Sequence, residues 1–81
     1  MAWTVYMLEC SDTSLYMGIT VDLPRRLDEH SKGKGAKYTK HRGPFTVVFT
    51  EFQDTRGQAL KKEAAIKAMT REGKLGLIGT G

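Results

Sequence analysis

The sequence is poor in several kinds of residue, and each scarcity narrows the class of protein. The single cysteine, Cys10, excludes an internal disulfide bond, and nothing in the chain indicates an oxidising compartment. The first ten residues lack a basic start and a long apolar run, so they predict neither a signal peptide nor a membrane span. We therefore expect a cytoplasmic protein that does not contact a membrane.

Length and composition predict one small globular domain over residues 1–81. Hydrophobic residues make up 40% of the chain and charged residues 27%, which is typical of a folded domain and not of a disordered chain. A domain of this length buries only a thin core. The formal net charge is +4, and its distribution along the chain is more informative than its size.

The positive charge gathers in residues 31–42, a segment without any acidic residue. Its glycines, Gly33 and Gly35, predict a flexible loop. The basic side chains of the segment are Lys32, Lys34, Lys37, Lys40 and Arg42. Such a loop suits a polyanion, whose backbone charge must be neutralised, so we expect these side chains to bind nucleic acid. The alternative is a solvated loop that only keeps the domain soluble.

The hydrophobic pattern predicts three strands, two main helices and a short last helix. The strands are rich in β-branched and aromatic residues, and the third is a long apolar run typical of a well-covered strand. The main helices begin at capping residues, Asp22 for the first and Thr55 with Gln58 for the second. The expected ranges are 3–9, 14–19 and 44–50 for the strands, and 23–31, 55–70 and 70–78 for the helices.

The first two strands place two tyrosines on one face of the sheet. If Cys10 faces Ser14 across a three-residue turn, Tyr6 pairs with Gly18 of the neighbouring strand. Side chains alternate along strands, so Tyr6 and Tyr16 then project to the same side. A slip of one residue in the register would separate the two tyrosines.

Two ionisable residues share the inward stripe of the first helix. The stripe has the i, i+3, i+4, i+7 spacing of one helix face and consists of Leu23, Arg26, Leu27 and His30. Arg25 points to the opposite side. An inward guanidinium needs a partner or a function, because arginines are almost never fully buried unpaired.

A single carboxylate interrupts the apolar face of the second helix. Glu63 lies on the stripe formed by Ala59, Ile66 and Met69. Taken alone, it has a structural explanation as an ion pair with Lys67, four residues on. The other inward polar groups have structural explanations too, as strand aromatics, an ion pair or a helix-end histidine. One small core has difficulty satisfying all of them together, which favours a functional site.

The ordered set of these residues resembles the GIY-YIG nuclease domain over nearly the whole chain. Thr4-Val5-Tyr6 stands at the first motif of that family, and Tyr16-Met17-Gly18 stands at the second. Residues 22–30 are similar to its arginine helix, residues 31–39 to the loop of its short stand-alone bacterial members, and residues 59–67 to its glutamate helix. Thr4 and Val5 differ from the first two letters of the family's first motif, and Met17 differs from the middle letter of its second. The chain also contains no asparagine, a residue that many members carry late in the domain.

The resemblance implies an α+β fold, with a three-stranded antiparallel sheet flanked by helices, that hydrolyses DNA with one divalent ion, Mg²⁺ or Mn²⁺. Glu63 would hold the metal, and Arg26 would bind the phosphate and stabilise its growing charge. Tyr6 would act as the base or orient the attacking water, and Tyr16 would hydrogen-bond within the site. His30 would orient a phosphate or assist proton transfer. We expect Tyr6, Arg26 and Glu63 to open onto one shallow surface, and which tyrosine is the base stays open.

Three hypotheses about function stay open. The first is a metal-dependent endonuclease, structure-selective in DNA repair or recombination and acting on branched or nicked DNA. The second is a non-catalytic nucleic-acid-binding module with the same fold, and the third is an adaptor subunit that needs a protein partner. Such a partner would supply DNA specificity. The presence of Tyr6, Arg26 and Glu63 favours catalysis, because a pure binder needs no acid at a phosphate site.

Overall fold

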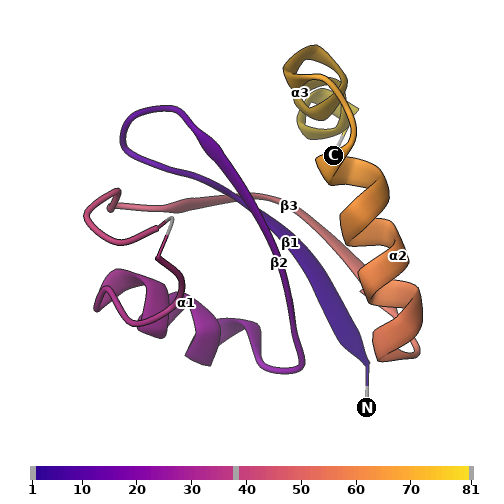
Figure 1. Ribbon diagram of the computed structural model, residues 1–81, viewed down its shortest axis with the longest axis horizontal. Helices are drawn as coiled ribbons and strands as arrows, with labels where there is room; N and C mark the ends of the chain where they lie inside the picture. The colour runs from indigo at the N-terminus through magenta and orange to yellow at the C-terminus, as the bar shows by residue number, and fades with distance from the viewer. Residues whose placement is uncertain (1, 38, 81) are drawn as a thin grey trace.

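The computed structural model describes residues 2–37 and 39–80 of the chain. These residues form a three-stranded antiparallel sheet, in the order β2-β1-β3, and three helices. The strands are β1 (Trp3–Glu9), β2 (Leu15–Thr20) and β3 (Thr46–Gln53), and the helices are α1 (Leu23–Ser31), α2 (Arg56–Lys67) and α3 (Arg71–Thr80). α1 and the loop after it lie on one side of the sheet, and α2 and α3 lie on the other (Figure 1). This is the α+β architecture that the sequence predicts.

The register of the first hairpin is the predicted one. β1 and β2 are antiparallel, and Tyr6 lies opposite Gly18. A backbone hydrogen bond of 2.9 Å from the Cys10 N–H to the Ser14 carbonyl closes the turn. Even-numbered residues of both strands therefore share one face, and Tyr6 and Tyr16 lie together on it.

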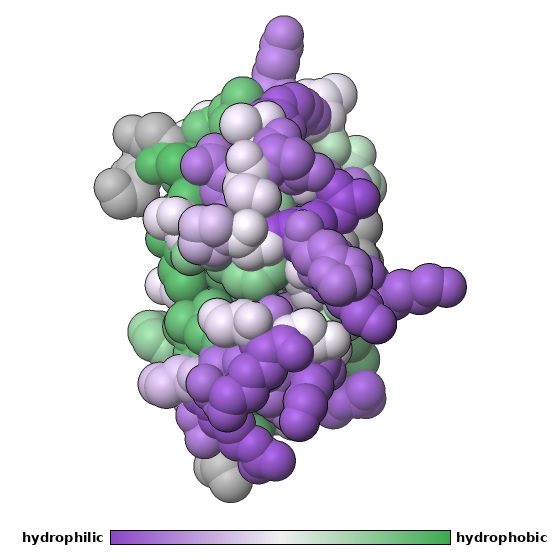
Figure 2. Space-filling model, turned by 90° about the vertical axis from the view of Figure 1, so that its left-hand side faces the viewer, coloured by the Kyte–Doolittle hydropathy of each residue, from purple (hydrophilic) through white to green (hydrophobic). Residues whose placement is uncertain are grey.

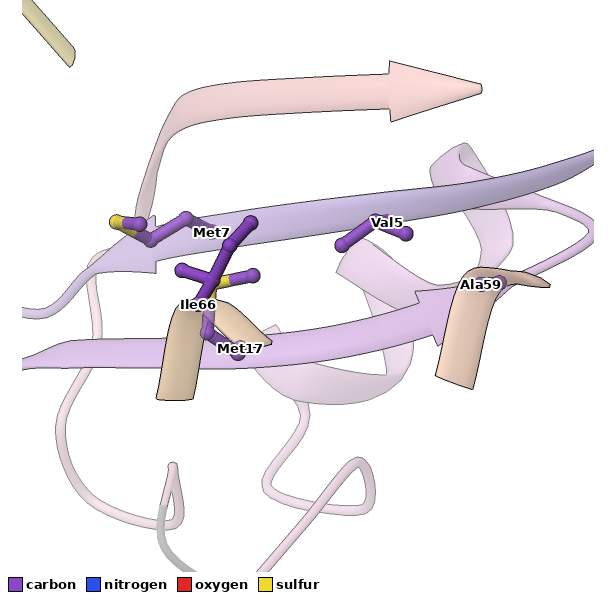
Figure 3. Close-up of a cluster of buried hydrophobic side chains, with 5 residues drawn as sticks. All are labelled: Val5, Met7, Met17, Ala59 and Ile66. Atoms are coloured by element: carbon purple, nitrogen blue, oxygen red, sulfur yellow. The ribbon is translucent and has the colours of Figure 1, made fainter. Parts of the chain in front are cut away.

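The opposite face of the hairpin carries the apolar core. The side chains buried there are Val5 and Met7 of β1, Met17 of β2, and Ala59 and Ile66 of α2 (Figure 3). Each large apolar side chain contributes about 1.5–3 kcal/mol when it is fully buried. The sheet therefore separates an apolar face, covered by α2, from a face that carries the tyrosines and is covered by α1.

Both predicted helix starts are present. The Asp22 side chain accepts a hydrogen bond of 3.2 Å from the Arg25 backbone N–H at the start of α1. Thr55 and Gln58 form both halves of a capping box at the start of α2. α2 ends at Lys67, slightly earlier than predicted. None of the helices in the described part of the chain has the length and apolarity needed to cross a lipid bilayer.

The third strand differs from its prediction in both position and burial. It begins at Thr46 and continues to Gln53, because Pro44 has no N–H to donate to the ladder with β1. β3 lies at the edge of the sheet, and none of its residues is buried. Phe52 is 72% exposed and Val47 is 37% exposed. The apolar run was therefore a wrong indicator of a well-covered strand, because an edge position decides exposure and sequence periodicity does not report it.

Candidate active site

Three aromatic rings from three elements meet on the even-numbered face of the hairpin. The ring centroids are 6.5 Å apart for Tyr6 and Tyr16, 5.9 Å for Tyr6 and His30, and 5.3 Å for Tyr16 and His30. Tyr6 and His30 are buried, whereas Tyr16 is half-buried. The structure thus brings the predicted tyrosines and histidine together, and of these three rings it exposes only part of Tyr16.

A glycine in β2 allows the Tyr6 ring to lie across that strand. A Cβ atom at Gly18 would overlap the hydroxyl and the ring of Tyr6. Real Cβ atoms do not approach other atoms so closely, so a side chain at this position would displace the tyrosine. Because β2 is an edge strand, the Tyr6 hydroxyl is carried from the central strand toward the edge of the sheet.

A buried hydrogen bond joins the Tyr6 hydroxyl to the His30 imidazole. Tyr6 Oη lies 2.8 Å from His30 Nε2, and Thr39 Oγ1 lies 2.8 Å from His30 Nδ1. Both ring nitrogens of His30 therefore have partners, and neither is available to a phosphate. Of the two roles expected for His30, this arrangement favours assistance in proton transfer.

Burial shifts the pKa values of both partners in this hydrogen bond. Burial raises the pKa of Tyr6, the nearby Arg26 guanidinium opposes the rise, and the charges of Tyr16 and Glu63 add to it. Burial also lowers the pKa of His30, and the positive charge of Arg26 lowers it further. Near neutral pH the pair therefore rests as a neutral phenol and a neutral imidazole.

Arg26 lies on the inner side of α1, as predicted, while Arg25 is exposed. Its Nη2 donates a hydrogen bond of 2.8 Å to the Gly35 carbonyl, and its guanidinium lies close enough to the Tyr6 hydroxyl to lower the pKa of that group. Its Nη1 lies 3.5 Å from Glu29 Oε1, a long and weak ion pair. With 28% of its side chain exposed, Arg26 holds a positive charge between the buried tyrosine and solvent.

Glu63 approaches these residues from the other side of the sheet. It lies on α2, which covers the apolar face, and Tyr6 has no exposed surface, so the expectation of one shallow surface shared by Tyr6, Arg26 and Glu63 is wrong. The Glu63 side chain is 18% exposed, and its Oε1 lies 3.8 Å from Lys67 Nζ, the ion pair that the sequence left open. Its charge nevertheless raises the pKa of Tyr6, so the carboxylate is electrostatically coupled to the tyrosine.

A cavity of about 250 Å³ lies beside the edge strand β2, between that strand and the helices α2 and α3. Tyr16, from the tyrosine face, lines it together with its neighbours in β2, Lys67 of α2 and Lys74 of α3. Lys67 is also the ion-pair partner of Glu63. A ligand in this edge cavity would therefore meet the half-buried tyrosine from one side and the lysine partner of Glu63 from the other.

The basic loop packs closely against α1, and its glycines serve this packing. A Cβ atom at Gly35 would overlap the His30 ring, and Gly33 has a φ of +75°, which side chains rarely adopt. The flexibility of the loop stays a prediction, but the glycines have a steric role that the sequence did not indicate. They allow the backbone to turn after α1 and to approach the imidazole.

The five basic residues of the loop fall into two groups. Lys32 Nζ lies 2.8 Å from Asp28 Oδ2, and Arg42 forms an ion pair with Asp12 in the turn between β1 and β2. Lys34, Lys37 and Lys40 are exposed like Lys32, and the structure gives none of these three a salt bridge within the described residues, while Tyr38 lies outside them. The surface on this side of the molecule is mainly hydrophilic, with an apolar band along one side (Figure 2).

Thr39 contacts the candidate site, and the sequence analysis did not predict it. It is 1% exposed and contacts His30, although it lies in a loop of small and basic residues. No periodicity marks a loop residue as buried, so the sequence carries no signal for it. The contact depends on how the loop folds back onto α1.

Comparisons with known proteins show the family of this chain. The family model described as the GIY-YIG catalytic domain matches residues 2–75. The chain belongs to the GIY-YIG family. It is 49% identical over 74 residues to the UPF0213 proteins SAV0488 and SA0446 of Staphylococcus aureus strains Mu50 and N315, and the match covers 91% of this chain and 90% of each relative.

Two solution NMR structures of GIY-YIG relatives share the fold. The UPF0213 protein BH0048 from Bacillus halodurans matches with a TM-score of 0.64 and 42% identity, and the protein EF2693 from E. faecalis matches with a TM-score of 0.69 and 41% identity. Each match covers 99% of this chain and 85% of the other. The resemblance to short stand-alone bacterial members of this nuclease family is thereby confirmed.

We expect the stability of this GIY-YIG domain to decrease as the pH falls below about 6.5, the ordinary pKa of histidine. Burial disfavours the protonated form of His30, so its contribution to stability is fully present above that value and is lost as the pH falls toward the lowered folded-state pKa. Melting temperatures measured between about pH 7.5 and 5.5 would test this.

The matched controls for this prediction are the two histidine variants. His30→Gln keeps a polar side chain that does not titrate, so it should flatten the pH dependence. His41→Gln changes an exposed histidine and should leave the dependence as it is in the wild type. Equal pH dependence in the wild type and in His30→Gln would show that His30 does not cause it.

Proposed function

We propose that this GIY-YIG domain is a divalent-metal-dependent endonuclease that hydrolyses DNA phosphodiester bonds. The observation that carries the proposal is the edge cavity beside β2, which is lined by both Tyr16 and Lys67, the partner of Glu63. A phosphate in this cavity would be close to two lysines and to a carboxylate whose charge acts on Tyr6. Family membership supports the same reaction class.

Arg26 supports the proposal because its charge is fixed in place before any substrate binds. The Gly35 carbonyl holds its guanidinium beside Tyr6, and the weak contact with Glu29 can be exchanged for a phosphate oxygen. A guanidinium held in this way stabilises charge that develops on a phosphate without having to reorganise.

Burial assigns different roles to the two tyrosines. Tyr16 keeps exposed surface and lines the edge cavity, so its hydroxyl is the better placed of the two to orient the attacking water. Tyr6 is buried and neutral, and its hydroxyl holds His30 in place. The hydrogen bond from Tyr6 to His30 gives the tyrosine a route to release its proton when the charge balance of the site changes.

Glu63 would hold the divalent ion, Mg²⁺ or Mn²⁺. Within the described ranges, 2–37 and 39–80, no group of three or more His, Cys, Asp or Glu residues is placed to hold a metal. A lone carboxylate fits Mg²⁺, which commonly takes one or two carboxylates and fills its remaining positions with water and substrate phosphate oxygens. When bound, the ion supplies positive charge at the phosphate and acidifies its bound water. Glu63 would exchange its contact with Lys67 for the ion.

The basic loop would contact the DNA backbone next to this site. Lys34, Lys37 and Lys40 are exposed, and a cavity of about 240 Å³ between the loop and the end of α1 is lined in part by Lys32 and Lys40. Backbone contacts carry little sequence information, so selection by DNA structure fits this surface. Branched or nicked substrates, a role in repair or recombination, and a protein partner that supplies specificity belong to this proposal.

Removal of the Glu63 charge should abolish most cleavage without loss of DNA binding. Glu63→Gln keeps the shape of the side chain, and we expect cleavage to decrease by roughly 10²-fold or more. Arg26→Ala should have a similar effect, whereas Arg25→Ala, on the exposed side of α1, should retain activity. The measurement is the cleavage rate on branched, nicked and single-stranded DNA with Mg²⁺ or Mn²⁺.

Two outcomes of this experiment would count against the proposal. Cleavage that survives Glu63→Gln would mean that another group holds the metal or that a contaminating nuclease is present. A wild type that binds DNA but cleaves none of these substrates would favour the non-catalytic binding module. Melting curves of the variants would show that each is folded.

The two tyrosine variants should separate stability from catalysis. Tyr16→Phe should lower the cleavage rate at saturating DNA with little change in melting temperature, because Tyr16 is half-buried at the edge cavity. Tyr6→Phe removes the partner of a buried imidazole and should destabilise the fold by about 1–3 kcal/mol. A fully active Tyr16→Phe beside a stable but inactive Tyr6→Phe would assign the water-orienting role to Tyr6 instead.

The exposed lysines of the loop should account for part of the salt dependence of DNA binding. Each phosphate contact that is lost should flatten the plot of log affinity against log salt by about 0.9 on duplex DNA. We therefore expect a shallower slope for the double variant Lys34→Ala and Lys37→Ala. Lys61→Ala, which changes an exposed lysine of α2, is the control. Unchanged affinity and slope in the double variant would show that the loop is only solvated.

A further inference from the structure

Thr39 is buried in the middle of a loop whose neighbouring lysines are exposed. It is 1% exposed, and its hydroxyl lies 2.8 Å from His30 Nδ1. The hydroxyl also donates a hydrogen bond of 3.0 Å to the Ala36 carbonyl, and the Thr39 carbonyl accepts one of 3.1 Å from the Arg42 N–H. Thr39 is therefore held by a residue before it in the loop, by a residue after it, and by His30 of α1.

The hydrogen bonds of this group run in one direction. Arg26 lies close enough to the Tyr6 hydroxyl to lower its pKa, but a guanidinium only donates and cannot accept the Tyr6 proton. Tyr6 is fully buried, so its own proton goes to His30 Nε2, which must then be unprotonated. A neutral imidazole with a free Nε2 carries its proton on Nδ1, which donates to Thr39 Oγ1. The Thr39 proton goes to the Ala36 carbonyl oxygen.

We propose that Thr39 is a positioning residue that holds His30 in the Nδ1–H tautomer, so that Nε2 can accept the proton of Tyr6. In the opposite tautomer, Nε2–H would point at the Tyr6 oxygen. The proton of Tyr6 would then face a guanidinium that cannot accept it, and a buried donor would be left without a partner. The partner of one ring nitrogen thus sets the chemistry of the other.

This assignment links the basic loop to the tyrosine, and the link rests on the proposed function. The Gly35 carbonyl, in the same loop, accepts the hydrogen bond of Arg26, so the loop holds both groups that contact the Tyr6 hydroxyl. A loop displaced by unsuitable DNA would release Arg26 and His30 together. Binding of the loop to the phosphate backbone would therefore keep His30 in position to accept the proton of Tyr6.

The tautomer of His30 can be measured by ¹⁵N NMR of the free wild-type protein, which needs no activity. We expect Nδ1 to carry the proton and Nε2 to have the shift of an unprotonated nitrogen. Thr39→Val keeps the shape and removes the hydroxyl, so it should populate the Nε2–H form, and Thr39→Ser should restore the wild-type pattern. His41, exposed in the same loop, should be unaffected. A wild-type Nε2–H tautomer, or no change in Thr39→Val, would overturn the proposal.

Cleavage assays then test the functional link. Thr39→Val keeps every lysine of the loop, so DNA affinity and its salt dependence should stay unchanged while the rate at saturating DNA falls on the order of tenfold, the rate equivalent of one hydrogen bond. Thr39→Ser should recover the rate. A loss of affinity with an unchanged rate would contradict positioning. If the wild type cleaves no DNA, the proposed function fails and the NMR measurement alone decides the role of Thr39.

Discussion

The hydrogen bond between Tyr6 and His30 is the interaction on which the candidate site depends. It joins the central strand of the sheet to α1 at 2.8 Å, with both residues buried. If either partner were lost, the other would keep an unsatisfied polar group in the interior, which costs about 1–3 kcal/mol. The bond is possible because Gly18 leaves room for the phenol to cross β2 and because Gly35 lets the loop close over the imidazole. Two glycines, distant in sequence, therefore make one buried contact possible.

Local rules predict the elements that this contact joins. The alternation of side chains and the short turn at Cys10 and Ser14 correctly predict that Tyr6 and Tyr16 share a face, because the register follows from the turn. The caps at Asp22 and Thr55 mark the helix starts, and helix periodicity separates the inward Arg26 from Arg25. Each of these properties depends on residues within a few positions of one another, so it can be predicted from the sequence alone.

Other features depend on how segments far apart in the sequence pack together, so local sequence patterns do not predict them. The exposure of β3 follows from its edge position, and the burial of Tyr6 follows from the cover that α1 and its loop provide. Thr39 becomes part of the site only because the loop returns to His30. The side of the sheet from which Glu63 approaches depends on how α2 packs, and its helical stripe could not indicate this. The residue types of the candidate site were therefore predictable, and their division between two faces was not.

This division constrains the chemistry that the site can perform. Tyr6 is fully buried and Glu63 lies on the helix that covers the apolar face, so under the proposed function a substrate would reach this group at the edge of the sheet, around β2. The edge cavity, lined by Tyr16 and Lys67, lies where such a substrate would bind. Burial keeps the pKa of Tyr6 raised and that of His30 lowered, so neither carries a charge before substrate arrives. The charge of Arg26 lowers the pKa of Tyr6 and the charge of Glu63 raises it, so under the proposed function a phosphate or a metal ion that changed either charge would shift the proton between Tyr6 and His30.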